Sequence, residues 1–330
     1  MQIVFGDLVI CDYELGATLS PIELELYTSG VQAVPEVLLG EPLTLGSLRR
    51  QGVLDIPLAE FVRVRDRFTE RVWSAGTAAA TRRHLDDLVR RADTLAGDVE
   101  ARLLADRIDG DLLRAYHGTL VRLMAYHVLN WWLPVDDYER LLAGLLGPER
   151  GRDVLFRLLT PSRQPHMISF HEEILAADRS APAAAERLAR QVGYLQTWGA
   201  AASVLESPAA MSQHLSGLDA GHAADGLALM RAARTDARRR RDEALAEALA
   251  AAHADPARFD RVEALAIMCQ LACDEEEDRR VHQLRGLRNL RVVARLAGTD
   301  LTRTSFVRLL STAAGSVRTP LAGVPGTDGR

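Results

Sequence analysis

Apolar residues recur at steps of three and four along most of the chain, which is the repeat of an amphipathic α-helix. From about Pro57 this pattern is nearly continuous and predicts a series of helices. Their approximate ranges are 61–95, 110–132, 136–147, 150–159, 165–177, 182–205, 227–252 and 257–297. The last would be roughly 55–60 Å long at 1.5 Å per residue. The pattern therefore predicts an all-α, multi-helix bundle that ends with a long C-terminal helix.

The N-terminal part differs from the rest of the chain. Residues 1–11 are rich in Val, Ile and Phe and could form a short edge strand. Ser20, Pro21 and Glu23 have the spacing of a capping box that begins a helix, and residues 40–52 are expected to form a loop. We predict three parts: an N-terminal segment with little regular structure (1–56), a helical domain that holds a ligand pocket (57–313) and a disordered tail (314–330).

Composition narrows the possible functions. The 330 residues carry a net charge of −5, which gives no reason to expect a nucleic-acid partner. Every basic residue is Arg, so a Schiff-base or P-loop lysine is excluded. No apolar run is long enough to span a membrane. Three cysteines without a signal peptide indicate the cytoplasm. Cys269 and Cys273 are interpreted as core thiols, and no metal or cofactor is expected.

The segment 110–132 contains the first candidate site. Its apolar face is formed by Leu113, Tyr116, Leu120, Met124, His127 and Trp131. His127 interrupts this face beside Trp131, so a pocket for a flat organic ligand could be built from His127, Tyr126, Asn130 and Trp131. A hydrogen-bonded core histidine is the alternative interpretation.

Two further segments carry similar signals. His171 interrupts an apolar face of the helix 165–177, and nearby carboxylates suggest acid–base chemistry. Sequence neighbours do not face each other on a helix, so a boundary histidine is the alternative. Tyr194 and Trp198 are spaced for one helical face and are followed by small residues. They indicate either a pocket wall or tight helix packing.

The long C-terminal helix has a polar interruption in its apolar face. Extending that face from both ends places Glu276, Arg280 and Gln283 on it. Buried polar groups are costly unless they are paired or border a wet cavity. The helix therefore either crosses the floor of a polar pocket, with Asp278 and Arg288 contributing, or passes through solvent. A second charged run, residues 238–241, is interpreted as a solvated face, although an arginine cluster can also attract phosphate.

Two stretches resemble a known family. CDEEEDRRVHQLRGLRNLRVVARLAGTDLTRTSFVRLL and VGYLQTWGAAASVLESPAAMSQHL are similar to parts of the helical middle domain of phosphoenolpyruvate-utilising dikinases, such as phosphoenolpyruvate synthase and rifampin phosphotransferase. The resemblance covers roughly residues 61–310. It implies a substrate-binding domain that works with separate phosphotransferase subunits. The chain departs from the family because it has no Gly-rich ATP-grasp loop, no lysine and no segment like that around a phospho-histidine.

Three functions are consistent with these observations. The chain could bind a hydrophobic small molecule, such as a secondary metabolite, in a helical pocket. It could instead be a stand-alone enzyme, a cyclase, lyase or terpene-cyclase-like protein. Its acid–base groups would then be His127, His171, Glu276 and Asp278, although the D-D-x-x-D motif of terpene cyclases is missing. The third possibility is a non-catalytic helical scaffold, in which these groups are packed and bonded.

Overall fold

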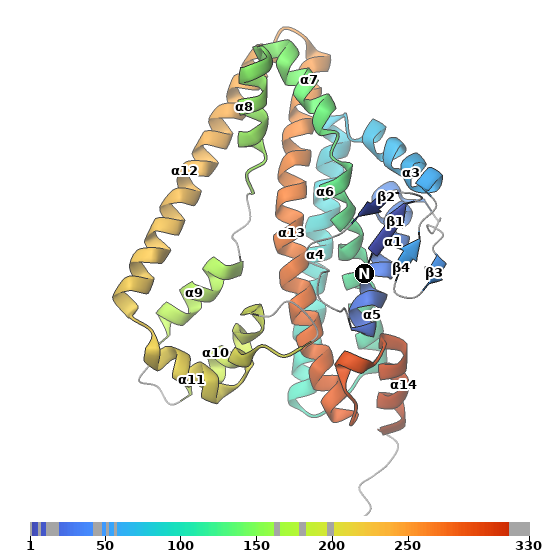
Figure 1. Ribbon diagram of the computed structural model, residues 1–330, viewed down its shortest axis with the longest axis vertical. Helices are drawn as coiled ribbons and strands as arrows, with labels where there is room; N and C mark the ends of the chain where they lie inside the picture. The colour runs from blue at the N-terminus through green and yellow to red at the C-terminus, as the bar shows by residue number, and fades with distance from the viewer. Residues whose placement is uncertain are drawn as a thin grey trace, which may run out of the picture.

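The computed structural model describes residues 2–5, 8–10, 20–41, 48–50, 53–55, 58–161, 166–177, 183–196 and 201–316. The predicted multi-helix fold with a long C-terminal helix is confirmed. Helix α13 (Pro256–Leu296) has 41 residues and passes through the middle of the molecule (Figure 1), a length of about 60 Å. Asp255 begins it by accepting hydrogen bonds from the backbone of Ala257 and Arg258.

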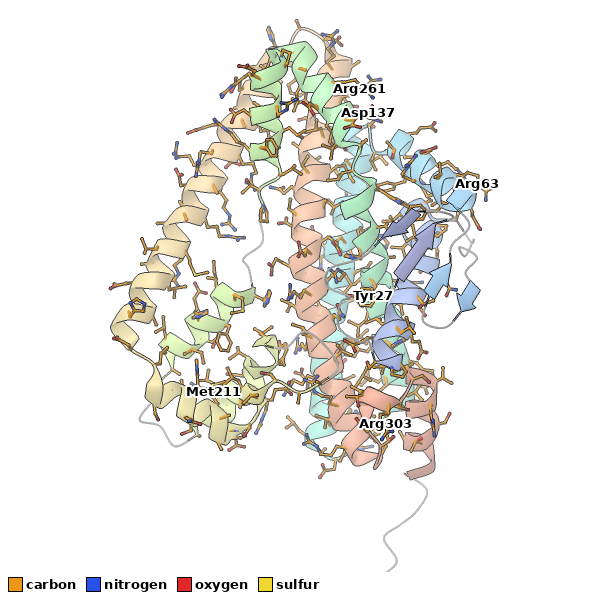
Figure 2. The ribbon with its side chains drawn as sticks, viewed as in Figure 1. Tyr27, Arg63, Asp137, Met211, Arg261 and Arg303 are labelled. Carbon is orange, nitrogen blue, oxygen red and sulfur yellow. The ribbon has the colours of Figure 1, made fainter. Side chains whose placement is uncertain are left out.

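The main hydrophobic core lies on one side of α13. Helix α4 (Ala75–Leu104) lies along α13, and α5 (Gly110–Ala125) packs against both. Beyond α5 the chain continues through η2 (Tyr126–Val128) and α6 (Leu129–Trp132). Gly286 lets α13 approach α5 closely, because a Cβ there would lie 2.5 Å from Leu120 Cδ1. Tyr27 belongs to this core and Met211 to a second one, on the other side of α13 (Figure 2).

The N-terminal segment has more regular structure than we expected. The Ser20 capping box is present, with the Ser20 backbone donating to Glu23 at 2.9 Å. It begins α1 (Pro21–Gln32), which is followed by α2 (Val34–Leu39), and both pack against α5. The residues of the predicted edge strand form β1 (Gln2–Phe5) and β2 (Leu8–Ile10).

Two strands that were not predicted complete a small sheet. They are β3 (Leu48–Arg50) and β4 (Val53–Asp55), and the order is β2-β1-β4-β3. The two hairpins are antiparallel and the central β1–β4 pair is parallel. The predicted loop 40–52 is therefore wrong at residues 48–50. Helix α3 (Leu58–Arg71) follows the sheet.

Helices α7 and α8 form one end of the molecule. Helix α7 (Val135–Leu146) contacts α8 (Pro148–Leu158) through Gly151, where a Cβ would lie 2.6 Å from the Ala143 backbone nitrogen. Near this end α12 (Ala220–Ala252) approaches α13, and farther along the two helices diverge (Figure 1). Asp219 caps α12, so this helix begins at Ala220 and not at the predicted residue 227.

The second core fills the space between the diverging ends of α12 and α13. It is formed by α9 (His166–Ala176), α10 (Ala184–Gln191), η3 (Gly193–Gln196), η4 (Val204–Glu206), α11 (Pro208–Gly217) and Leu284 of α13. The predicted helix 182–205 ends at Gln191. Gly193 packs on Leu205, whose carbonyl oxygen would lie 2.4 Å from a Cβ.

The chain then returns to the main core. A short turn, η5 (Leu301–Arg303), leads to α14 (Phe306–Ser316). Phe306 stacks on His117 of α5, with ring centroids 3.8 Å apart. Residues 314–316 of the predicted tail belong to α14, and residues 317–330 lie outside the described part of the chain. None of the described helices has both the length and the apolar character needed to cross a membrane.

Candidate functional site

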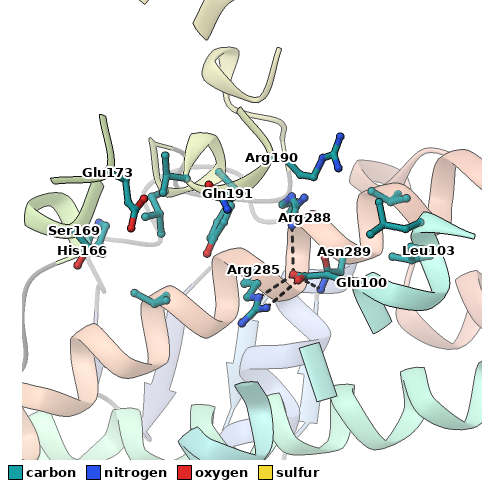
Figure 3. Close-up of a pocket in the computed structure, with 16 residues that line it drawn as sticks. Glu100, Leu103, His166, Ser169, Glu173, Arg190, Gln191, Arg285, Arg288 and Asn289 are labelled. Atoms are coloured by element: carbon teal, nitrogen blue, oxygen red, sulfur yellow. Dashed lines mark hydrogen bonds and ion pairs between the residues drawn. The ribbon is translucent and has the colours of Figure 1, made fainter. Parts of the chain in front are cut away.

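A cavity of about 750 Å³ lies between the two cores. It is bordered by α4 and α13 on one side and by α9, α10 and η3 on the other (Figure 3). Its apolar lining consists of Leu103, Leu104, Val192, Leu195, Val281 and Val292. Its polar lining consists of Glu100, His166, Ser169, Glu173, Arg190, Gln191, Tyr194, Arg285, Arg288 and Asn289. The volume is within the range of small-molecule sites, roughly 300–1,000 Å³.

The carboxylate of Glu100, from the last turns of α4, organises the polar floor of the cavity. Arg285 donates to both of its oxygens, Nε to Oε1 at 2.8 Å and Nη2 to Oε2 at 2.9 Å. Arg288 Nη1 and Asn289 Nδ2 donate to Oε1 at 3.3 and 3.4 Å (Figure 3). Burial raises the pKa of Glu100, but hydrogen bonding and charge from Arg285, together with Arg288 and Asn289, outweigh it. The net pKa lies below the ordinary value, so the carboxylate is charged at neutral pH.

Arg288 is held between Glu100 and an aromatic ring. Its guanidinium carbon lies 5.7 Å from the centroid of Tyr194, a cation–π distance. Tyr194 is buried, and burial raises the pKa of its phenol, so the ring stays neutral. Arg285 also contacts Asp93, at 3.2 Å from Nη1 to Oδ1. Arg285 therefore bonds to two carboxylates, those of Glu100 and Asp93. Arg288 borders the cavity and makes one hydrogen bond among the described residues, to Glu100.

A histidine–carboxylate pair lies at the opposite wall. His166 Nδ1 is 2.8 Å from Glu277 Oε2, and the backbone nitrogen of His166 donates to the same oxygen at 3.0 Å. Burial raises the pKa of Glu277, but the bonds from His166 lower it further than burial raises it. A carboxylate at Nδ1 fixes the ring and its tautomer, which leaves Nε2 as the atom that can serve a ligand.

Two of the predicted site residues, Tyr194 and Arg288, line this cavity. His171 is on α9 but not among the lining residues, and its Nδ1 contacts the Met167 carbonyl at 2.7 Å. Trp198 lies outside the described residues, as do the side chains of Asn130 and Trp131.

The predicted polar face of α13 is displaced by one residue. Glu275 and Arg279 are the buried pair, with 2.8 Å between Oε1 and Nε, whereas Glu276 is exposed. Gln283 is buried as expected, but it accepts a hydrogen bond from Arg279 at 3.3 Å. One step along a helix rotates a side chain by about 100°, which accounts for the error at Glu276. Asp278 and Arg280 are half-buried. Unlike Arg288, the predicted residues Glu276, Asp278, Arg280 and Gln283 do not line the cavity.

Tyr126 and His127 are buried in the main core. The Tyr126 hydroxyl donates to the Thr81 carbonyl at 3.2 Å and lies 2.9 Å from His84 Nδ1. The His127 ring meets Tyr27 edge-on at 6.1 Å and interacts electrostatically with Glu275. Both are buried core residues and neither is among the residues that line the cavity.

Several lining residues were not predicted. Arg285 and Asn289 are four residues apart, about one helical turn, and Arg288 lies between them. This spacing is visible in the sequence and places the three side chains near one another. Glu100, Leu103 and Leu104 gave no signal, because the helix that carries them was expected to end near residue 95. Among the described residues, no three His, Cys, Asp or Glu side chains gather closely enough to hold a metal ion.

Comparison with known proteins gives no relative from which a function could be transferred. No protein-family model, curated protein or solved structure matches the chain. The cavity and the residues that line it are therefore the basis for assigning a function.

Proposed function

We propose that the protein binds a small organic molecule with an apolar body and one anionic or hydrogen-bond-accepting group in the cavity between α13 and α9–α10. The observation that carries the proposal is the combination of an apolar wall with a fixed polar floor. Glu100 holds Arg288 and Asn289 in place before a ligand arrives. Such preorganisation lowers the entropy cost of binding.

The charges of the cavity favour an acceptor group on the ligand. The lining contains three guanidinium groups, those of Arg190, Arg285 and Arg288, against the carboxylates of Glu100 and Glu173. Arg285 is neutralised by Glu100 and Asp93. Arg288 and Asn289 therefore supply donors at the floor, while Val292 and Leu195 contact the apolar body. The proposal rests on these residues and not on the resemblance to dikinases.

A probe with the proposed character tests the cavity. We expect 8-anilinonaphthalene-1-sulfonate to bind the folded protein with a saturable rise in fluorescence. Val292→Trp should weaken this binding about tenfold or more, because the larger side chain fills the space and each 1.4 kcal/mol is a factor of ten. Val307→Trp is the matched control, since Val307 is 66% exposed on α14 and lies outside the cavity lining.

The fold of each variant would be checked by near-ultraviolet circular dichroism, because this dye also binds loosened cores. Equal affinity in the wild type and in a folded Val292→Trp variant would place the dye elsewhere and remove the support for the proposal. Native mass spectrometry of the purified protein would then identify any ligand that it retains from the cell.

Catalysis on the bound molecule is a second candidate function, favoured by the His166–Glu277 pair. A histidine fixed by a carboxylate can act as a general base, and His166 borders the cavity. If His166 acts as a general base, His166→Gln should change the affinity for the ligand by less than about twofold. The same variant should reduce the rate at which the bound molecule is converted by about a hundredfold or more. Loss of affinity and turnover to the same extent would instead indicate that His166 only binds.

A further inference from the structure

Helix α12 has an apolar face that three arginines interrupt. Leu227, Arg234, Arg241 and Ala248 follow one another at steps of seven, so they lie on the same side of the helix. Leu227 and Ala248 are buried. Arg238 lies between the other two arginines, one helical turn from each. The face is therefore apolar at both ends and cationic in the middle, where the helix has diverged from α13 (Figure 1).

Some nitrogen atoms of Arg234 and Arg241 on this face have no hydrogen-bond acceptor. Nε and Nη2 of Arg234 are closed off from solvent and make no hydrogen bond, and the same is true of Nη1 of Arg241. Arg241 uses its other nitrogens for Asp242, at 3.0 and 2.8 Å. Buried donors are normally paired, and guanidinium groups gather only when an anion compensates their repulsion. Burial, together with the charges of Arg238 and Arg241, lowers the pKa of Arg234.

The carboxylates opposite are already engaged. Asp274 and Glu277 of α13 act on Arg234 electrostatically, but neither hydrogen-bonds to it. Asp274 accepts from Arg82 Nη1 at 2.8 Å, and Glu277 is bonded to His166. Figure 2 shows side chains of α12 extending into the space between the two helices. Arg234 thus lies near carboxylates that already have other hydrogen-bond partners.

We propose that the cationic part of this face of α12 binds a phosphoryl group, with Arg234 and Arg241 as its direct donors and Arg238 contributing charge. A phosphoryl group has several strong acceptor oxygens and up to two negative charges, which matches adjacent guanidinium groups better than a single carboxylate does. The source would be a phosphorylated small molecule or inorganic phosphate. This site is separate from the cavity described above and does not depend on the function proposed for it.

Titration calorimetry with pyrophosphate and with inorganic phosphate, at constant ionic strength in chloride, tests the site. We expect saturable binding to the wild type and at least about tenfold weaker binding to Arg234→Gln and to Arg241→Gln, the loss of one charge-assisted bond. Arg240→Gln is the matched control, because Arg240 is 54% exposed on the same helix and pairs with Asp236. It should bind within about twofold of the wild type.

Thermal unfolding is a second measurement, and it distinguishes a specific site from general electrostatic screening by the added phosphate. Because Nε and Nη2 of Arg234 are buried without acceptors, Arg234→Gln should unfold at a higher temperature than the wild type without phosphate, and pyrophosphate should stabilise it less. If Arg234→Gln does not fold, Arg241→Gln carries the affinity test alone.

Three outcomes would overturn the site. They are undiminished binding to both variants, an equal loss in Arg240→Gln, and saturable binding of citrate without binding of either phosphate. Comparing the two phosphates shows whether one phosphoryl group is sufficient. Val292→Trp should bind pyrophosphate like the wild type, so a failure of the cavity proposal is distinguishable from a failure of this one.

Discussion

Replacing Arg279 with methionine should lower the free energy of unfolding by about 3–5 kcal/mol, the usual effect of leaving one member of a buried ion pair without its partner. Its partner Glu275 is fully buried, and Arg279 itself is 2% exposed. The variant would leave the buried Glu275 carboxylate without the Arg279 guanidinium and would remove the bond to Gln283. Urea unfolding followed by circular dichroism measures the difference.

The double variant Glu275→Leu/Arg279→Met is the informative control. Burial raises the pKa of Glu275 even though the Arg279 guanidinium lies beside it, so desolvation outweighs the attraction within the pair. Removing both charges should therefore restore most of the lost stability. The same spacing on the surface, Glu186 with Arg190, should contribute less than about 1 kcal/mol. A double variant as unstable as the single one would contradict this account of the buried pair.

The second large effect is expected at Glu100. Glu100→Gln should destabilise the protein by about 2 kcal/mol, because Arg285 and Arg288 would lose the charge that neutralises them in a partly buried site. Asn289, which is buried, would also lose an anionic acceptor. Glu243→Gln is the control, since Glu243 pairs with an exposed arginine on α12. A loss no larger than that of the control would mean that Glu100 does not hold the cavity floor.

The effect at Glu100 should depend on pH in one direction. The folded pKa of Glu100 lies below its ordinary value of 4.5, so the unfolded chain takes up a proton first as the pH falls. The stability that Glu100 contributes is present above pH 4.5 and is lost as the pH falls through the folded pKa. The difference between wild type and Glu100→Gln should therefore shrink below about pH 4.5. A difference that stays constant from pH 7 to pH 3 would contradict the linkage.

Helix positions could be predicted from the sequence because most depend on local signals. Ser20 was identified as a helix start, and it caps α1 through a bond within the first turn of that helix. The predicted elements are wrong where contacts between residues far apart in the sequence determine the structure. The chain leaves the helical path at Gly193 because Leu205 approaches its backbone closely, and β4 pairs with β1 from about fifty residues away in the sequence. Neither contact produces a periodic pattern.

The candidate site was predicted less well, for a related reason. A polar interruption of the apolar face of the last helix was predicted, but it was assigned to Glu276 and Arg280, whereas the buried pair is Glu275 with Arg279. The cavity is made where that helix meets Glu100 of α4 and Tyr194 of η3. These residues come from three separate parts of the chain, so only the tertiary structure brings them together.

The two hydrophobic cores have a consequence for how a ligand would enter. Leu284 joins the core of α9–α11, whereas Leu287 and Leu290, on the same helix, belong to the main core. The cavity lies along this boundary, where each core supplies part of the wall. A ligand bound as proposed would therefore contact both cores at once, and its entry between them would not require either core to open.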